Sequence, residues 1–258
     1  MIVWETIAVA FAMFSALPIP QPVWNKRNMR FALCAFPLVG IAIGVLTFAW
    51  HFAAVWLNCS ALLRGTGYCL IPILVTGGIH LDGYADTSDA LSSYASPEKK
   101  QEILEDPHCG AFAVIRLMVY CVAELALCTE LADSVSALLC LCALFCLSRV
   151  LSGIALTVFP LSKNTGLAHT FATSADKRRV RNVLLVLTVL LAILVLVVGQ
   201  WIGLFMLAAA GAVFWRYRVI AVREFGGVSG DLAGWFLQKA ELWMLAALVF
   251  GQLVEKIQ

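Results

Sequence analysis

The run Val183-Leu-Leu-Val-Leu-Thr-Val-Leu-Leu-Ala-Ile-Leu-Val-Leu-Val-Val-Gly199 decides the fold class, because it carries no charge. It approaches the roughly 20 residues that an α-helix needs to cross a hydrocarbon core about 30 Å thick. Of the 258 residues, 62% are hydrophobic and 13% charged, against about 45–50% and about 25% in soluble domains. Lipid cannot satisfy backbone hydrogen bonds, and long runs without alternation favour helices over a barrel. The sequence predicts an all-α, polytopic integral membrane protein.

Apolar runs between charged or turn-rich breaks predict about eight spans in a single domain, residues 1–258. They are residues 2–18, 31–57, 66–84, 111–130, 134–160, 182–199, 201–215 and 235–253. The first run is short and contains Glu5, so we expect seven spans if it does not cross. The start of the chain lacks the positive charge of a secretory signal, and we expect it to be retained.

The loops between these runs alternate between basic and nearly neutral. Loops 19–30, 85–110, 161–181 and 216–234 together hold 13 Lys and Arg residues, whereas the loops on the other side hold one. The positive-inside rule places the basic loops in the cytoplasm. The basic run Lys177-Arg-Arg-Val-Arg181 is explained by topology and anionic lipid, with a substrate phosphate as the alternative. The net charge of +2 is small and scattered, so we expect no nucleic-acid partner.

The stretch His80-Leu-Asp-Gly-Tyr-Ala-Asp-Thr-Ser-Asp89 brings acids to membrane depth. Only 15 uncharged residues precede it from Gly65 to Ile79, so a full span must continue into it. On a helix that turns about 100° per residue, Asp82, Asp86 and Asp89 share a stripe about 60° wide. A divalent cation would offset their repulsion and the cost of burying them, and carboxylate oxygens suit Mg²⁺ or Mn²⁺. Acids solvated at a helix end are the alternative.

Other polar residues of the basic side are candidates for the same site. Gly83 would allow a ligand or another helix to approach the backbone closely. Asp106 and Gly110 close the loop after the acidic run, and Gly227 and Asp231 belong to a glycine-rich turn that opens the last span. Such a turn can cradle a phosphate, although an ordinary turn capped by Asp231 explains it equally well.

Two further polar residues and one cysteine cluster have more than one interpretation. Arg149 lies deep in the fifth run, where it needs an acid such as Glu124 or an anionic substrate group. His80 faces away from the aspartate stripe. This orientation favours a contact with the substrate, or with a residue that itself binds the metal, over direct metal binding by His80. The cluster Cys140-Leu-Cys142-Ala-Leu-Phe-Cys146 is interpreted as apolar packing, with a soft-metal site as the alternative.

The motifs match a known family. Gly77-Gly-Ile-His-Leu-Asp-Gly-Tyr-Ala-Asp-Thr-Ser-Asp89 resembles the hallmark of the cobalamin synthases, adenosylcobinamide-GDP ribazoletransferases, written approximately GGxHLDGLADTxDG. The resemblance continues in order along nearly the whole chain, through Leu17-Pro-Ile-Pro20, Pro37-Leu-Val-Gly40 with Gly44, Ile103-Leu-Glu-Asp106 with Gly110, Ser148-Arg149, Gly166-Leu167, and Gly226-Gly-Val-Ser-Gly-Asp-Leu-Ala-Gly234 with Glu241. The chain departs from the pattern at Ala90, Ala113 and Gln238, which leaves Glu241 as the nearer match to an acid of the last helix.

This resemblance implies a reaction, its substrates and a place in the cell. A ribose hydroxyl of α-ribazole, or of its 5′-phosphate, would attack the cobinamide-bound phosphorus of adenosylcobinamide-GDP, and GMP would leave. The expected cofactor is Mg²⁺, held by Asp82 and Asp86, with Asp89 as ligand or base, so that Asp86 and Asp89 are the catalytic candidates. The expected substrate-binding residues are His80, Gly83, Asp106, Gly110, Arg149, Gly227, Asp231 and Glu241.

The expected location is a bacterial or archaeal inner membrane, among lipid, with the active site facing the cytoplasm. The identity of the lower-ligand base stays open, and so does the oligomeric state, a homo-oligomer included.

Two other classes share parts of the pattern. A CDP-alcohol phosphotransferase has DGxxA followed by Arg, but here Asp86 occupies the Arg position. A transporter with acids as cation sites is typically built from two repeated halves, and no second copy of the acidic run exists in this sequence.

Overall fold

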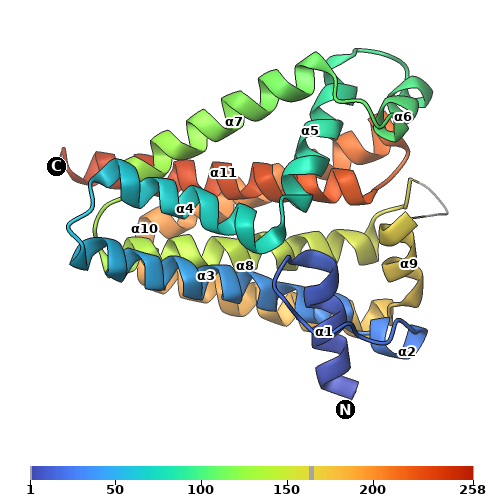
Figure 1. Cartoon of the computed structure of the whole chain (residues 1–258), viewed down its shortest axis with the longest axis horizontal. Coiled ribbons are helices and arrows are strands. Elements are labelled where there is room, and N and C mark those ends of the chain that lie inside the picture. The colour runs from blue at the N-terminus through green and yellow to red at the C-terminus, as the bar shows by residue number, and fades with distance from the viewer. Residues whose placement is uncertain (1, 163–165, 258) are drawn as a thin grey trace.

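A computed structural model describes residues 2–162 and 166–257 of the chain, and every regular element in these ranges is a helix (Figure 1). The helices are α1 (Ile2–Phe14), α2 (Lys26–Met29), α3 (Ala32–Trp56), α4 (Ala61–Thr76), α5 (Ile79–Ser92), α6 (Pro97–Glu105), α7 (Ala111–Glu130), α8 (Val135–Val158), α9 (Gly166–Ser174), α10 (Lys177–Phe225) and α11 (Gly230–Glu255). The all-α class expected from the sequence is confirmed.

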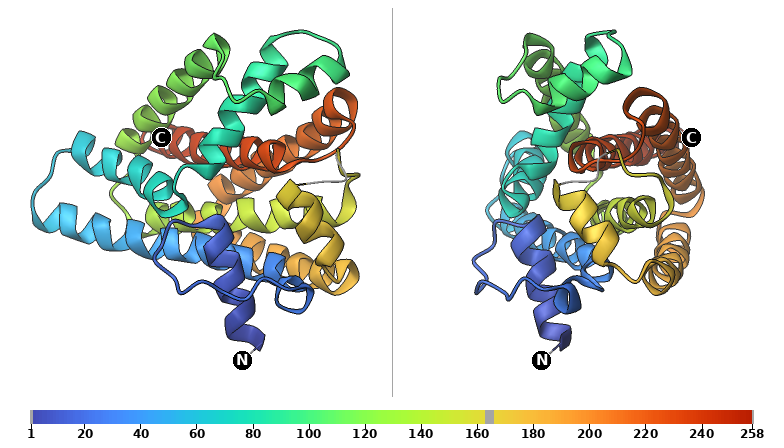
Figure 2. Two further views of the ribbon diagram at one scale, coloured as in Figure 1. Left: turned by 45° about the vertical axis from the view of Figure 1, so that its right-hand side comes forward. Right: turned by 90° about the vertical axis from the view of Figure 1, so that its right-hand side faces the viewer.

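Helices α8 and α11 form the centre of the bundle, and α7 and α10 lie on its outside. In the most apolar window of each helix, 83% of α8 and 67% of α11 is buried, against 22% of α7 and 11% of α10. Figure 2 shows α10 along one outer side and α4 along the other. The exposed large hydrophobic residues of α7 and α10 are mostly Val, Leu, Ile and Phe, and such a surface suits lipid rather than water.

Fewer than eight segments of the described residues have the length and composition to span a membrane. Among the described residues, five helices are long and apolar enough to cross a membrane, or six if the bent pair of α4 and α5 counts as one span. Helix α10 counts once in that total but contains a break at Gln200, where φ is 51°, so residues 177–199 and 201–225 form two arms. If the two arms of α10 are counted separately and the bent pair of α4 and α5 as one span, seven segments could cross. The first run forms only the 13-residue α1 and does not reach spanning length. This agrees with the expectation of seven spans if the first run does not cross.

The expected third span, residues 66–84, is not one continuous helix. Helix α4 ends at Thr76, α5 begins at Ile79, and their axes differ by 94°. Gly77 and Gly78 make this corner with φ values of 65° and 80°, a conformation that residues with a side chain rarely adopt. The expectation of a straight span was wrong because two successive left-handed glycines redirect the chain. The acidic run therefore lies across the bundle (Figure 1).

The loops expected to be basic gather at one end of the bundle. Helices α2, α6 and α9 and the connection from α10 to α11 lie at this end, and the C-terminus lies at the other (Figure 1). Lys100 of α6 pairs with Glu224 near the end of α10, and the Gln101 side chain donates to the Phe225 carbonyl at 2.9 Å. Arg30, which follows α2, pairs with Asp176 at 2.7 Å. These contacts tie the short helices to the spanning ones at the end where the acidic helix lies.

Candidate active site

Helices α5 and α11 cross where two glycines meet. A Cβ on Gly83 would lie 2.7 Å from the Asp231 carbonyl oxygen, and one on Gly234 would lie 2.9 Å from the His80 carbonyl oxygen. Both distances are too short for a side chain, so only glycine permits this approach. The prediction that Gly83 allows another helix to come close is confirmed. The consequence is that the acidic helix lies directly against the start of α11, which carries Asp231.

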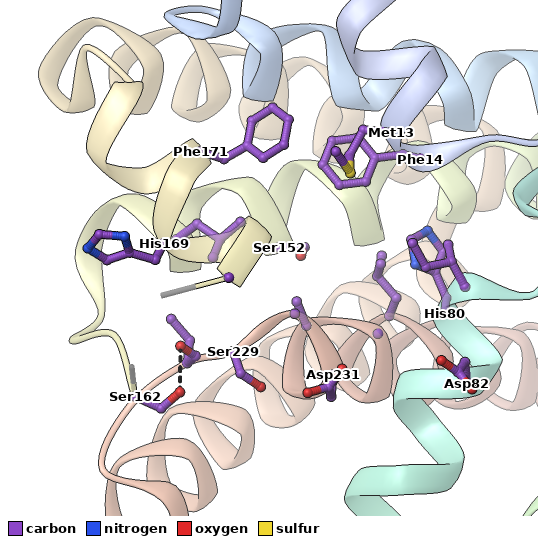
Figure 3. A pocket seen from close by; sticks show the side chains of 18 of the residues that line it. Met13, Phe14, His80, Asp82, Ser152, Ser162, His169, Phe171, Ser229 and Asp231 are labelled. Atoms are coloured by element: carbon purple, nitrogen blue, oxygen red, sulfur yellow. Dashed lines mark hydrogen bonds between the residues drawn. The ribbon is translucent and has the colours of Figure 1, made fainter. Parts of the chain in front are cut away.

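A cavity of about 480 Å³ opens beside this crossing (Figure 3). Asp82 and Asp231 lie along one side, and His80 stands at one end. The opposite wall is apolar and is made by side chains from α1, α3 and α9, namely Met13, Phe14, Phe36 and Phe171. The cavity thus joins an acidic side to an aromatic side, and its volume lies within the usual range of small-molecule sites.

The carboxylates of α5 do not act as one set. Asp86 is half-buried and experiences the negative charges of Asp82, Asp231 and Asp89. Asp89 turns toward α7, because its Oδ1 accepts a hydrogen bond of 3.0 Å from the backbone N–H of Ala113 in the first turn of that helix. No group of three or more His, Cys, Asp or Glu side chains within residues 2–162 and 166–257 is arranged to hold a metal. The three-acid metal unit is therefore not preformed and stays a prediction.

Arg149 has a different partner from those expected. Its Nη1 donates to Glu241 Oε1 at 2.8 Å and to the Phe145 carbonyl at 2.7 Å, and Ser148 Oγ donates to the same Glu241 oxygen at 2.6 Å. The two alternatives, Glu124 or a substrate anion, both missed Glu241, which lies 92 residues away in sequence. Glu124 lies near enough to Glu241 to interact with it electrostatically.

Three polar atoms near the base of the cavity are buried and have no hydrogen-bond partner among the described residues. They are His80 Nε2, Ser152 Oγ and Arg149 Nε. His80 and Ser152 line the cavity. The centroid of the Phe36 ring lies 5.9 Å from the Arg149 guanidinium carbon and 6.0 Å from the centroid of the His80 ring. A buried polar atom without a partner costs about 1–3 kcal/mol. A ligand in the cavity can remove that cost at His80 and Ser152.

The chain matches the family model described as cobalamin-5-phosphate synthase over residues 6–249. It belongs to the cobalamin-5-phosphate synthase family. It is 39% identical over 248 residues to an adenosylcobinamide-GDP ribazoletransferase of Lachnoclostridium phytofermentans, covering 96% of this chain and 94% of the relative. Relatives with the same name from Geobacillus sp. strain WCH70 and Geobacillus kaustophilus are 29% and 30% identical, covering 93% and 96% of this chain and 94% and 98% of the relatives. No solved structure matches the chain.

In this synthase-family chain, His80 and Asp231 line the cavity and the other six expected substrate-binding residues lie outside its wall. Gly83, Arg149 and Glu241 belong to the helix contacts described above, and the remaining three lie at helix ends or in loops. Asp106 is exposed, and its Oδ1 accepts from the His108 backbone and ring at 2.9 and 2.6 Å, which lowers the pKa of Asp106 below its usual value. Gly110 passes so close to Asp89 that an added Cβ would lie 2.2 Å from Oδ2. The Gly227 N–H donates to the Ala221 carbonyl at 2.8 Å, which closes the end of α10. Substrate contacts by all six residues stay predictions.

The start of α11 also differs from the capped turn that the sequence suggested. Ser229, rather than Asp231, caps α11, because its side chain accepts from the Leu232 N–H at 3.2 Å. Asp231 occupies the first turn and faces the cavity instead (Figure 3). The helix dipole and the uncapped N–H groups of this turn favour negative ligand charge near it.

Sequence reasoning missed several residues that line the cavity in this family member. Ser152 follows Arg149 by three positions and so lies on the same face of α8, a periodicity that would have identified it. Glu105, Ser162 and His169 come from loops and short helices, and no local pattern marks them. Their place depends on the packing of α6 and α9 at the basic end.

Proposed function

We propose that this chain is an adenosylcobinamide-GDP ribazoletransferase, which joins α-ribazole or its 5′-phosphate to adenosylcobinamide-GDP and releases GMP. The observation that carries the proposal is the cavity, in which Asp82 and Asp231 lie opposite an aromatic wall and the buried Nε2 of His80 has no partner among the described residues. Family membership and the names of the relatives support the same assignment. The match favours this function over the CDP-alcohol phosphotransferase alternative.

The cavity walls fit the two halves of such a reaction. Phe14, Phe36 and Phe171 offer apolar contact to the aromatic base of α-ribazole. Asp82 and Asp231 lie opposite, where they can accept the proton of the attacking hydroxyl. His80 Nε2 and Ser152 Oγ can bond to the polar groups of a bound nucleoside. The large corrinoid would remain at the mouth of a cavity of about 480 Å³.

We further propose Mg²⁺ as the cofactor, held by Asp82 and Asp86 with Asp231 facing them. Mg²⁺ is commonly bound by one or two carboxylates together with substrate phosphates, and this donor set contains only hard oxygen ligands. The charges of Asp82, Asp231 and Asp89 all act on Asp86, a repulsion that a cation relieves. When bound, the metal would neutralise the pyrophosphate and the departing GMP. Asp89 is already engaged at the start of α7, which makes it the weaker candidate for ligand or base.

The assignment is tested by measuring GMP release from adenosylcobinamide-GDP by the detergent-purified chain. GMP should appear only when α-ribazole or its 5′-phosphate is also present. Asp82→Asn and Asp231→Asn should each lower turnover by about a hundredfold or more if they provide base or metal-ligand catalysis. Asp133→Asn is the matched control. Asp133 lies in the connection from α7 to α8, at the other end of the bundle, and pairs with Arg64 at 3.0 Å. GMP release without the second substrate would contradict a transferase.

We propose that the basic end, and with it the cavity, faces the cytoplasm of a bacterial cell. The basic loops gather at this end, and the positive-inside rule supports the orientation. Two native thiols provide a test, since Cys109 is exposed in the loop before α7 and Cys59 lies in the loop before α4. An impermeant maleimide should label Cys59 in intact cells and Cys109 only after permeabilisation. The reverse pattern would reverse the orientation.

A further inference from the structure

A second cavity, of about 470 Å³, lies on the opposite side of α5 from the aspartates. Tyr84 and Ser88 of α5 line it, and on a helix of about 100° per residue these two positions point roughly 120–160° away from Asp82 and Asp86. The remaining walls come from α7, α10 and α11. The catalytic proposal uses none of the residues that line this cavity.

Three cations converge on the cavity from three different helices. They are Arg116 of α7, Arg216 of α10 and Lys239 of α11. The charges of both arginines act on Lys239, which also lies over the ring of Tyr84 at 5.4 Å. None of the three cations forms an ion pair with an acid among the described residues. Three repelling cations in one cavity favour an anion between them.

The position of two of these cations along their helices supports an anionic ligand. Arg216 lies nine residues before the end of α10, and Lys239 lies nine residues after the start of α11, about 13 Å along each helix at 1.5 Å per residue. Both cations therefore lie near the boundary between the basic end and the apolar part of the bundle, where lipid headgroups would meet them. These helices are among those long and apolar enough to span.

The mouth of the cavity has the character of a lipid–water interface. Trp243 and Tyr94 line it and are 54% and 89% exposed. Tryptophan and tyrosine are enriched where a protein meets lipid headgroups, and basic pockets between spanning helices recognise anionic headgroups. Helices α7 and α10, which provide two of the cations, have the smallest buried shares among the five helices long and apolar enough to span.

We propose that this cavity binds the phosphate headgroup of an anionic phospholipid through Arg116, Arg216 and Lys239. The acyl chains would leave past Trp243 along the outer faces of α7 and α10. A bound lipid would brace α5 from behind, because Tyr84 and Ser88 belong to the same helix as Asp82 and Asp86.

The test is a lipid titration of the detergent-purified chain, followed by its unfolding temperature. Phosphatidylglycerol should raise the Tm, since a ligand that binds only the folded state stabilises it. Phosphatidylcholine of the same chain length should not raise it. Arg216→Gln and Lys239→Gln should each raise the half-saturating concentration of phosphatidylglycerol about tenfold, the effect of losing one charged contact of about 1.4 kcal/mol. Arg218→Gln is the matched control, because it removes an equal charge from α10 at a residue that contacts Phe159 and does not line the cavity.

GMP and inorganic phosphate form the other arm of the titration. GMP is the product of the proposed reaction and can bind the catalytic cavity, so any rise in the Tm caused by either anion should be the same for the wild type, Arg216→Gln and Lys239→Gln. If GMP stabilises the chain through Arg216 and Lys239 and phosphatidylglycerol does not, the lipid assignment is overturned in favour of a nucleotide site. Equal responses of the wild type and the two cavity variants to phosphatidylglycerol would overturn the site itself.

A measurement that keeps all three cations covers the case in which a glutamine variant does not fold. Brominated phosphatidylglycerol should quench the wild-type tryptophan fluorescence more strongly than that of Trp243→Phe, with no such difference for brominated phosphatidylcholine. Equal quenching by the two lipids would contradict the proposal.

Discussion

Arg149 and Glu241 form an ion pair of 2.8 Å in the centre of the bundle, with only 1% and 4% of their side chains exposed. It joins the two most buried spanning helices, α8 and α11, directly behind the wall of the cavity. Taking both charges out of water costs several kcal/mol, and only the attraction between them and their additional hydrogen bonds offset it. The pair is therefore a weak source of net stability, but the loss of either member leaves a buried charge alone.

We predict a strongly non-additive cycle for this pair. Arg149→Met and Glu241→Gln should each lower the free energy of unfolding by about 3–5 kcal/mol, because each leaves an uncompensated group. The double variant should be less damaged than the sum of the two. Thermal unfolding of the four proteins in one detergent measures the coupling, with Glu255→Gln at the far end of α11 as control. Additive losses would show that the two residues act independently.

A second prediction concerns the crossing of α5 and α11. Gly83→Ala should lower turnover by at least about tenfold, since the added Cβ meets the Asp231 backbone at 2.7–2.8 Å and overpacking typically costs about 1–3 kcal/mol. Gly211→Ala is the matched control, because nothing lies within 4 Å of its added Cβ. Normal turnover of a folded Gly83→Ala protein would contradict the role of this crossing in placing Asp82 against Asp231.

Asp89 allows its structural and metal roles to be separated. Asparagine keeps an oxygen for the Ala113 N–H but loses the charge, so Asp89→Asn should retain the stability and the Mg²⁺ midpoint of the wild type. Asp89→Ala should destabilise the protein by about 1 kcal/mol through loss of the cap. Unfolding and Mg²⁺ titrations of both variants provide the measurement. A higher Mg²⁺ midpoint for Asp89→Asn would restore Asp89 as a ligand.

The junction of Arg30 and Asp176 predicts a dependence of stability on pH. Hydrogen bonds from the Arg30 side chain and the Arg179 backbone lower the pKa of Asp176 below its usual value. Because the pKa of Asp176 is lower in the folded chain than in the unfolded chain, the contact stabilises the fold at pH values above the unfolded-state pKa. This stabilisation is lost as the pH falls through the folded-state pKa. Asp176→Asn keeps the cap on α10 but not the charge, so its Tm should fall below that of the wild type at pH 7 and converge with it in acid. Parallel curves at all pH values would contradict this.

The sequence predicted those features that depend on local pattern. Charge-free runs such as 183–199 required spanning helices, and the isolated Gln200 between two such runs marked the break in α10. The corner at Gly77 and Gly78 was not predicted. Two glycines in an apolar run are also compatible with a straight helix, and tertiary packing selects the left-handed conformation.

Contacts between residues far apart in the sequence could not be predicted from local pattern. The depth of Arg149 correctly required a buried partner, but nothing local distinguishes Glu124 from Glu241, and the choice depends on how α8 packs against α11. Likewise, the stripe of Asp82 and Asp86 follows from helical periodicity, whereas the approach of Asp231 depends on the contact between Gly83 and the α11 backbone.

The last prediction is that Asp82, Asp86 and Asp231 act together on Mg²⁺. Removing one carboxylate should raise the Mg²⁺ concentration needed for half-maximal GMP release and lower turnover at the same time. The losses should not add, because once the metal is misplaced a second substitution has little more to remove. Asp82→Asn combined with Asp86→Asn should therefore be scarcely worse than either alone. Acids that were merely solvated would instead give small, independent losses and no change in metal dependence.

The measurement is a Mg²⁺ titration of GMP release for each single and double variant that retains the wild-type unfolding temperature. Asp133→Asn is a suitable control, because Asp133 pairs with Arg64 at the other end of the bundle and does not line the cavity. Chelation of the metal should abolish release, and added Mg²⁺ should restore it. If Asp82→Asn, Asp86→Asn and Asp231→Asn all keep near-normal turnover at the wild-type Mg²⁺ midpoint, the crossing of α5 and α11 does not hold the metal, and the carboxylates of the cavity serve substrate binding alone.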